Sequence, residues 1–215
     1  MILRNLYRKL GGQWKFRSYR FTLPLDNKHA TQMNKCQGTI IRRIPLTETS
    51  MIVTWCTIEH GILKTVAKGA RRPKSPFFGK IDLFFEAEFE ISRSKKSDLH
   101  QLRDIAIINT RAKIRESYQK TLAASYFVEL INKVSEPEAP IRSIYGLLVR
   151  ALNFLEKSNP TQRAVLHFEK EIASDLGILD PEKLPVEILS ELYNLPKMRP
   201  DLIKFINKQN KDSNS

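Results

Sequence analysis

The chain has 215 residues, a hydrophobic fraction of 41% and a formal net charge of +13. This composition is compatible with packed cores in one domain or two small ones, and it argues against global disorder. The longest uncharged apolar run is too short to cross a bilayer, so neither a transmembrane helix nor a membrane partner is expected. A basic balance of this size, with a pI near 9.8, indicates a polyanion as the partner.

The positive charge is concentrated in the first half of the chain. Residues 1–35 contain eight Lys or Arg and one acid, and residues 36–110 contain twelve and eight. Residues 111–215 contain sixteen and fourteen and are nearly balanced. The surface that faces a polyanion is therefore expected in the N-terminal half.

Residues 1–33 form a basic extension without a sustained period, in which Asp26 is the only acid. Three interpretations are open: an organellar targeting segment, a disordered basic arm that adds affinity for nucleic acid, or residues upstream of a true translation start at Met33. The third is favoured, because Met33 directly precedes the first clear strand. The sequence does not decide whether residues 1–32 are translated in vivo.

Short strands are predicted through residues 34–110. Two of them are joined by the tight turn Glu59-His60-Gly61, which is typical of a hairpin. In Ile81–Ile91 the odd positions are apolar and the even ones are acidic except for Phe84, so the acidic face is expected in water. The five predicted strands are residues 38–44, 50–58, 62–67, 81–91 and 99–107. Five strands in about 75 residues predict an OB-like β-barrel.

Helical periodicity begins after the predicted barrel. Apolar side chains recur every four residues from Ile114 to Val134, which predicts one long amphipathic helix. Further helices are predicted over residues 141–155, 160–176, 181–194 and 200–207. The predicted fold class is α+β, with a five-stranded OB-like β-barrel followed by an α-helical bundle domain over residues 111–208.

The helix ends carry the usual sequence signals. Asn159 is a candidate N-cap before Pro160 at the first helical position, and Gly177 is a good C-terminal terminator. The polar tail of residues 209–215 is expected to fray.

No catalytic or metal-binding constellation emerges. Cys36 and Cys56 both lie in predicted strands and are expected to be buried thiols rather than a disulfide. The four histidines are scattered, and no phosphate-cradling glycine loop of the Walker type is present. Neither an enzyme nor a bound cofactor or metal is expected.

The basic loop Lys68-Gly69-Ala70-Arg71-Arg72-Pro73-Lys74-Ser75 places four cations within seven residues. Paired cations neutralise phosphates and release counterions, whereas the alternative is a merely solvated loop. Phe77 and Phe78 follow, and aromatic faces stack bases in single-strand binders. Barrel-core packing is the alternative for both rings and is favoured for Phe78. The predicted nucleic-acid contacts are Arg42, Arg43, Lys68, Arg71, Arg72, Lys74, Phe77 and Lys80.

These segments resemble one protein family. The run Gly38-Thr39-Ile40-Ile41-Arg42-Arg43, then Glu48-Thr49-Ser50, His60-Gly61 and the basic loop, is similar to the N-terminal domain of the bacterial recombination mediator RecO. Phe168-Glu169 through Asp175-Leu176-Gly177 is similar to that family's helix ending in Leu-Gly. The likeness covers about residues 34–180, and the extension before Met33 lies outside the family pattern.

The resemblance implies an OB-fold domain, a helical domain and a non-enzymatic role in DNA repair and recombination. RecO proteins bind single- and double-stranded DNA, anneal complementary strands, and act with RecR to load RecA onto DNA coated by single-strand binding protein (SSB). A bacterial cytoplasmic, nucleoid-associated location follows. Many members carry a four-cysteine zinc site after the Leu-Gly helix end. Here Ile178-Leu179-Asp180-Pro181 follows without cysteine, so a zinc-less variant is expected.

The resemblance also implies contact with the SSB C-terminal tail, which is acidic with an apolar end. Such a tail needs a pocket that combines a cation with hydrophobic walls. The candidate residues are Tyr126, Leu130 and Lys133, or Arg150, for each of which bundle packing or a plain surface charge is the alternative.

Two rival functions remain open. One is an OB-fold RNA-binding or ribosome-associated protein, because basic loops and aromatic faces serve RNA equally well. The other is a protein-only adaptor whose charge aids solubility. The sequence leaves open the oligomeric state, the preferred DNA structure and the SSB and RecR interfaces.

Overall fold

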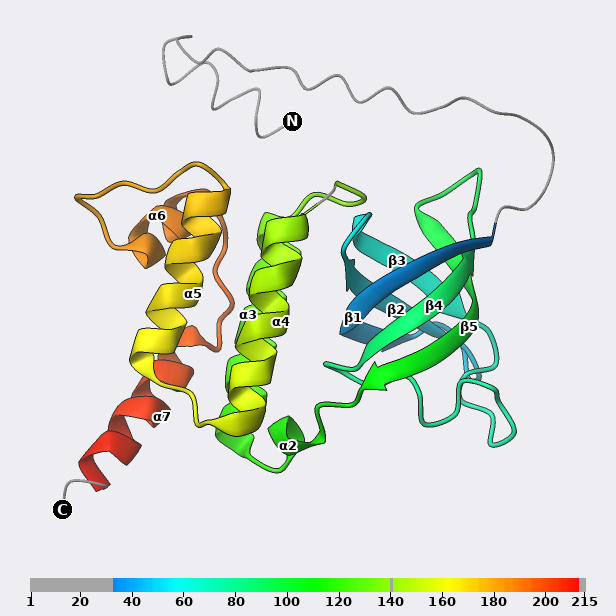
Figure 1. Cartoon of the computed structure of the whole chain (residues 1–215), viewed down its shortest axis with the longest axis horizontal. Helices are drawn as coiled ribbons and strands as arrows, with labels where there is room; N and C mark the ends of the chain where they lie inside the picture. The colour runs from blue at the N-terminus through cyan, green and yellow to red at the C-terminus, as the bar shows by residue number, and fades with distance from the viewer. Residues whose placement is uncertain (1–32, 140, 213–215) are drawn as a thin grey trace, which may run out of the picture. The chain divides into compact units, whose positions relative to one another are not determined.

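Five strands close residues 33–109 into a barrel, as the computed structural model shows for the described part of the chain, residues 33–139 and 141–212 (Figure 1). Neighbouring strands follow the order β1-β2-β3-β5-β4, and β4 pairs back with β1. The pairings are antiparallel except for the short one between β3 and β5. The strands are β1 (Met33–Pro45), β2 (Met51–Thr57), β3 (Gly61–Ala67), β4 (Glu86–Ser92) and β5 (Leu99–Asn109).

A helical region follows the barrel, which confirms the predicted α+β fold of a five-stranded barrel and a helical domain. The helices in the described residues are α2 (Ala112–Arg115), α3 (Tyr118–Val134), α4 (Arg142–Lys157), α5 (Gln162–Asp175), α6 (Pro185–Leu192) and α7 (Arg199–Asp212). The predicted basic extension lies outside the described residues, apart from Met33 at the start of β1.

The long strand β1 pairs with two neighbouring strands along its length. Residues 33–39 pair with β4 and residues 38–45 with β2, with a register shift between Ile40 and Arg42. Beyond the shift, residues 42–45 pair with β2 alone and are exposed. Since successive strand residues point to opposite faces, Ile40 packs inside the barrel and Ile41 packs outward against the helices.

Two hydrophobic cores result from this arrangement. Inside the barrel, Trp55 stacks on Phe89 with ring centroids 3.9 Å apart. The second core joins the helices to the outer surface of the barrel, to which the strands contribute Cys56 and Ile62. Contact between the barrel and the helical region is therefore continuous hydrophobic packing rather than a flexible link.

The two cysteines confirm the prediction of buried, unpaired thiols. Cys36 lies in the barrel core and Cys56 in the core shared with the helices, and both are free. Burial raises the pKa of the Cys36 thiol to about 11 and that of the Cys56 thiol to about 12.

The predicted long strand over residues 81–91 is wrong in its first half. Phe84 has a φ of +69°, and the N–H of Phe85 donates to the carbonyl of Asp82 at 3.3 Å, so the chain turns before β4 begins at Glu86. The expectation of a solvated acidic face is also wrong for Glu86, which is 9% exposed.

Glu86 is buried because it forms the polar joint between barrel and helices. Arg111, fully buried, donates from Nη2 to Glu86 Oε2 at 2.5 Å and from Nη1 to the carbonyl of Phe84 at 2.8 Å. From α4, the Tyr145 hydroxyl donates to Glu86 Oε1 at 3.1 Å, and Asn153 Oδ1 accepts from Arg111 Nε at 3.4 Å. The joint therefore links β4, the start of α2 and α4 through one ion pair.

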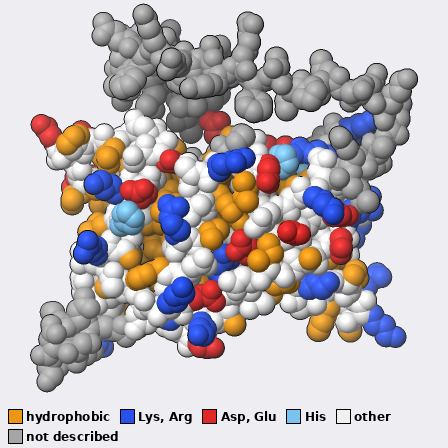
Figure 2. Space-filling model, in the orientation of Figure 1, with side chains coloured by type: hydrophobic (Ala, Val, Ile, Leu, Met, Phe, Trp, Pro, Cys, Tyr) orange, Lys and Arg blue, Asp and Glu red, His pale blue; other side chains and the backbone are white. Residues whose placement is uncertain are grey.

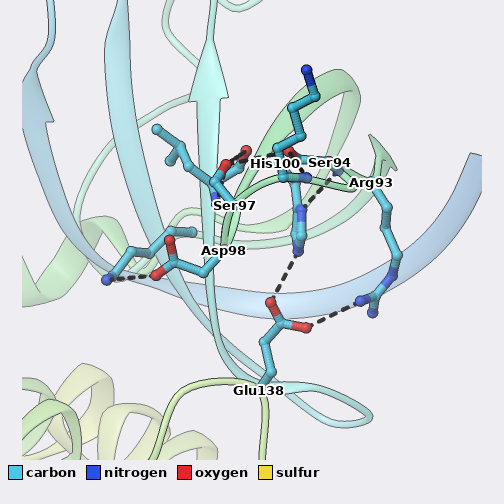
Figure 3. A network of polar contacts seen from close by, with 9 residues as sticks. Arg93, Ser94, Ser97, Asp98, His100 and Glu138 are labelled. Atoms are coloured by element: carbon cyan, nitrogen blue, oxygen red, sulfur yellow. Dashed lines mark hydrogen bonds and ion pairs between the residues drawn. The ribbon is translucent and has the colours of Figure 1, made fainter.

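A second polar tether reaches the barrel from the loop between α3 and α4. Figure 3 shows Glu138 pointing from this loop toward His100 and Arg93 at distances of 3.2 and 3.1 Å. His100 Nδ1 accepts the Ser94 N–H, so Nε2 carries the hydrogen of the neutral ring and donates it to Glu138. Gly61 allows the loop this close, because a Cβ on it would lie 1.9 Å from the carbonyl oxygen of Ala139.

The helix boundaries differ from the prediction at four places. The helix predicted over residues 181–194 is shorter, because α6 runs only from Pro185 to Leu192. The predicted helix from Ile114 is broken before α3, where the Ser117 side chain is the N-cap. Thr161, not Asn159, caps α5 by accepting the Ala164 N–H at 3.1 Å. Residues 209–212 of the predicted frayed tail continue α7. The prediction for Gly177 is confirmed: its φ is +67°, and the backbone closes α5 with the paired bonds of a Schellman motif.

Candidate nucleic-acid interface

The basic loop is held in shape by the turn between β1 and β2. The Gly69 N–H donates to Ser50 Oγ at 3.3 Å, and the Arg71 N–H donates to the carbonyl of Thr49 at 2.9 Å. Gly69 has a φ of +66°, a conformation that costs other residues energy. Backbone bonds from Arg72 to Gly69 and from Ser75 to Arg72 continue the fold of the loop. The cations are therefore presented on a preshaped loop.

A groove of about 620 Å³ lies between this loop and the exposed end of β1. Arg43 and Arg71 line it together with Met51, Phe78 and Asp82. Figure 2 shows Lys or Arg side chains beside hydrophobic ones over the loops at the lower right, where Figure 1 draws the segment from β3 to β4. The groove thus combines cations with an apolar surface, which suits a nucleic-acid strand.

Only some of the predicted contact residues meet at this groove. Arg43, Arg71 and Phe77 line it, and the side chains of Arg72 and Lys74 are exposed on the same loop. Lys68 lines a separate hollow of about 290 Å³ beside Arg93 and His100. Arg42 lies on the other side of β1, in a groove against α3.

Three of the predicted cations already have partners. Arg71 donates from Nη1 to the carbonyl of Thr47 at 3.5 Å. Lys80 donates from Nζ to the carbonyl of Ile105 at 3.3 Å and so fastens the loop to β5. Arg43 pairs with Asp82 at 3.1 Å, and both side chains are more than a third exposed. An exposed pair of this kind contributes only about 0–1 kcal/mol, so a phosphate can replace the carboxylate at Arg43.

The two phenylalanines have the opposite places to those predicted. Phe77 is 6% exposed and packs in the barrel core, so only a small part of it reaches the groove that it lines. Phe78 is 65% exposed at the edge of the groove. In a tight turn neighbouring side chains point apart, and the sequence carries no signal that selects which ring faces the core.

The predicted partner residues on α3 are divided in the same way. Tyr126 and Leu130 are fully buried, so they are not surface contacts. The Tyr126 hydroxyl donates to Glu169 Oε1 at 2.5 Å, and Arg199 pairs with the same carboxylate at 2.6 Å. Burial and the Glu169 carboxylate raise the pKa of Tyr126. Lys133 lies on the other face of α3, in the groove that also contains Arg42.

Arg150 lines a third groove, of about 490 Å³, between α4 and α5. Its other basic residues are Arg163 and His167, and its walls include Leu147 and Phe154. Among the described residues no acid lines this groove, although Glu171 lies 4.0 Å from His167. Figure 2 shows hydrophobic side chains between basic ones on the face where Figure 1 draws α4 and α5. Sequence reasoning found Arg150 but missed Arg163 and His167, which belong to the next helix.

Within the described residues, no group of three or more His, Cys, Asp or Glu side chains is placed to hold a metal ion. In that part of the chain, none of the helices has the length and apolar character needed to cross a membrane.

Comparison with known proteins identifies two family models in succession. Residues 32–111 match "Recombination protein O N terminal", and residues 115–179 match "Recombination protein O C terminal". The first match covers the barrel, and the second runs from the end of α2 to just beyond the Gly177 terminator.

Curated relatives agree with both models. The chain is 30% identical over 143 residues to the DNA repair protein RecO of Syntrophus aciditrophicus, which covers 66% of this chain and 54% of that protein. It is 30% identical over 139 residues to that of a Cyanothece species, covering 62% and 47%, and 28% identical over 146 residues to that of Exiguobacterium sibiricum, covering 68% and 58%. The chain thus spans about half the length of these relatives.

Proposed function

The chain belongs to the RecO family, and we propose that it acts in DNA repair and recombination by binding single- and double-stranded DNA on its barrel and annealing complementary strands. The observation that carries this proposal is the groove between β1 and the basic loop. It joins Arg43 and Arg71 to the exposed ring of Phe78.

Annealing requires two strands to approach although their phosphates repel each other. Exposed cations on the loop lower this repulsion by neutralising phosphates and releasing counterions. The ring of Phe78 offers a face on which one base stacks, which contributes about 1–3 kcal/mol. Neither effect needs a catalytic group, so the proposed activity is non-enzymatic.

The family membership supports further partners. We propose that the protein works with RecR to load RecA onto SSB-coated strands, in the bacterial cytoplasm and close to the nucleoid. The groove between α4 and α5 is the best place for the acidic, apolar-ended SSB tail, because Arg150, Arg163 and His167 flank apolar walls there.

The direct test is fluorescence-anisotropy binding of labelled single-stranded DNA across a salt series. The charge-reversal variant Arg71→Glu/Arg72→Glu/Lys74→Glu is expected to bind more weakly. Each lost phosphate contact is expected to lower the slope of log affinity against log salt by about 0.7. The matched control reverses three exposed cations of the helical region, Lys157→Glu/Lys170→Glu/Lys197→Glu, and is expected to keep the parent slope.

The outcomes separate the rival functions. Unchanged slope and affinity in the loop variant would contradict the barrel groove as the DNA site. A strong preference for an RNA oligomer of the same sequence would favour the RNA-binding alternative, and absent or salt-insensitive binding would favour the protein-only adaptor. For the tail, Arg150→Glu should weaken binding of an acidic, apolar-ended peptide and leave DNA affinity within about twofold.

A further inference from the structure

A second groove of about 440 Å³ adjoins the proposed DNA site. It lies between β1 and α3, and Arg43 lines both grooves. The residues that line it come from β1, the turn before β4, α3 and the segment before α7. They are Ile41, Arg42, Arg43, Leu83, Ser125, Val128, Glu129, Asn132, Lys133 and Met198.

One face of α3 forms a whole wall of this groove. Ser125, Val128, Glu129, Asn132 and Lys133 follow the spacing i, i+3, i+4, i+7 and i+8, which places them on one side of a helix. The spacing explains why the predicted apolar stripe, which contains Tyr126 and Leu130, is buried against the other helices. The polar groups of Ser125 and Asn132 lie partly exposed in the wall.

The groove offers apolar walls and a cationic rim. Ile41, Leu83 and Val128 form apolar surface, and its volume falls within the range of about 300–1,000 Å³ usual for small-molecule sites. Arg42 and Lys133 lie on opposite sides, one on β1 and one on α3. This combination suits a nucleotide of a single strand. The faces of its base are apolar, the edges of the base form hydrogen bonds, and the backbone that carries it is anionic.

Two carboxylates moderate the positive charge. Glu129 lies 3.9 Å from Lys133, and Asp82 lies 3.1 Å from Arg43. Glu129 lines this groove itself, whereas the only carboxylate paired with a lining residue of the α4–α5 groove among the described ion pairs is Glu171, 4.0 Å from His167. The β1–α3 groove is therefore the poorer site for an acidic peptide. One base with a phosphate on each side needs fewer cations around it than an acidic peptide with several carboxylates, so the remaining positive charge of this groove is enough for a base.

We propose that the β1–α3 groove binds one unstacked base of a single strand whose backbone runs over Arg43 from the groove at the basic loop. Arg42 and Arg43 contact the flanking phosphates, Asn132 reaches the edge of the base, and Lys133 supports the backbone on the far side. This inference rests on the proposed function and extends it. A base inside a duplex cannot enter the groove, so the site favours single-stranded over double-stranded nucleic acid.

The test fills the groove with a larger side chain. Ser125→Phe places a ring in the groove, and the matched control Ser190→Phe places one on the exposed face of α6. Affinity for a labelled single strand is expected to fall about tenfold in Ser125→Phe, as for the loss of one stacked base. Affinity for a duplex of the same length is expected to stay within about twofold in both variants.

A second measurement covers the case in which Ser125→Phe does not fold. The double variant Asn132→Ala/Lys133→Ala removes partly exposed side chains and should reduce single-strand affinity selectively in the same way. A strand that carries one photoreactive thymine analogue should crosslink to the peptide that contains α3.

The outcomes keep this inference apart from the proposed function. Equal losses for single and double strands, or no loss, would overturn the base site. If single-strand binding stays unchanged here but falls in the loop charge-reversal variant, the proposed function stands and the base site does not. Loss of acidic-peptide binding in Ser125→Phe, with DNA binding intact, would assign the groove to a peptide and overturn the inference as well.

Discussion

Arg111 is the side chain whose replacement tests the joint between barrel and helices most directly. Arg111→Met keeps much of the side-chain volume but removes the donors to Glu86 and to the Phe84 carbonyl. The Glu86 carboxylate, 9% exposed in the parent protein, then keeps two partners, the Tyr145 hydroxyl at 3.1 Å and the Gln37 amide at 3.2 Å. An unpaired buried charge is expensive, so the free energy of unfolding should fall by about 3–5 kcal/mol.

A double-mutant cycle separates the ion pair from the other contacts. Glu86→Gln removes the charge that Arg111 compensates, so the second substitution should cost less in the Arg111→Met background than in the parent. Tyr145→Phe removes one hydrogen bond to a charged acceptor and should cost about 1.5–3 kcal/mol. Additive costs for Arg111→Met and Glu86→Gln would show that the pair has no coupling energy.

Guanidinium chloride unfolding with two probes provides the assay. Trp55 fluorescence reports on the barrel core and far-ultraviolet circular dichroism on the helices, with Trp14→Phe in all variants so that Trp55 is the only tryptophan. Because one core spans barrel and helices, the two transitions should coincide in the parent protein. A loss below about 1 kcal/mol in Arg111→Met would refute the view that the buried pair holds the joint.

Two further predictions follow from burial. Phe78→Ala should weaken single-strand binding by about 1–3 kcal/mol and change the free energy of unfolding by less than about 0.5 kcal/mol. Phe77→Ala should lower the free energy of unfolding by about 3–5 kcal/mol, because this ring is buried. The reverse pattern in binding and denaturation measurements would contradict the placement of the two rings. The Cys56 thiol, whose pKa burial raises from 9.0 to about 12, should resist a disulfide reagent at pH 8 while the protein is folded. Since the unfolded thiol ionises first, Cys56 contributes stability that is full below pH 9 and is lost as the pH rises toward 12, and Cys56→Ala should flatten this decline.

Local patterns in the sequence predict most of the barrel. Alternating residues and turn signals place four of the five strands, and Gly177 marks the end of α5. The exception is β4, which begins at Glu86 rather than at the predicted residue 81. The alternation of apolar and acidic residues over residues 81–91 continues through the turn that precedes this strand. Alternation records which side chains are apolar, but it does not record that Phe84 adopts a left-handed backbone or that Arg111, 25 residues later, covers Glu86.

Only the charged part of the candidate site can be predicted from the sequence. Cation density identifies the basic loop, but the choice between Phe77 and Phe78 depends on which ring faces the barrel core. On α3, an apolar stripe marks the buried face, so Tyr126 and Leu130 are poor candidates for a surface contact. Surface grooves form between elements distant in sequence, and a helical period carries no information about which strand the polar face meets.

The position of Arg43 connects the stability of the molecule to its proposed activity. Arg43 belongs to the part of β1 that pairs with β2 alone, and it lines one groove against the basic loop and another against α3. The second groove exists only while α3 stays against β1, which depends on the shared core and on the tethers at Arg111 and Glu138. Neither Arg111 nor Glu138 lines the groove at the basic loop or the β1–α3 groove, so both residues act on these grooves by holding β1 and α3 in place rather than through their charge. The buried pair of Arg111 and Glu86 thus helps to fix the distance between β1 and α3. The exposed cations have a separate role, which is to attract the nucleic-acid backbone that crosses β1.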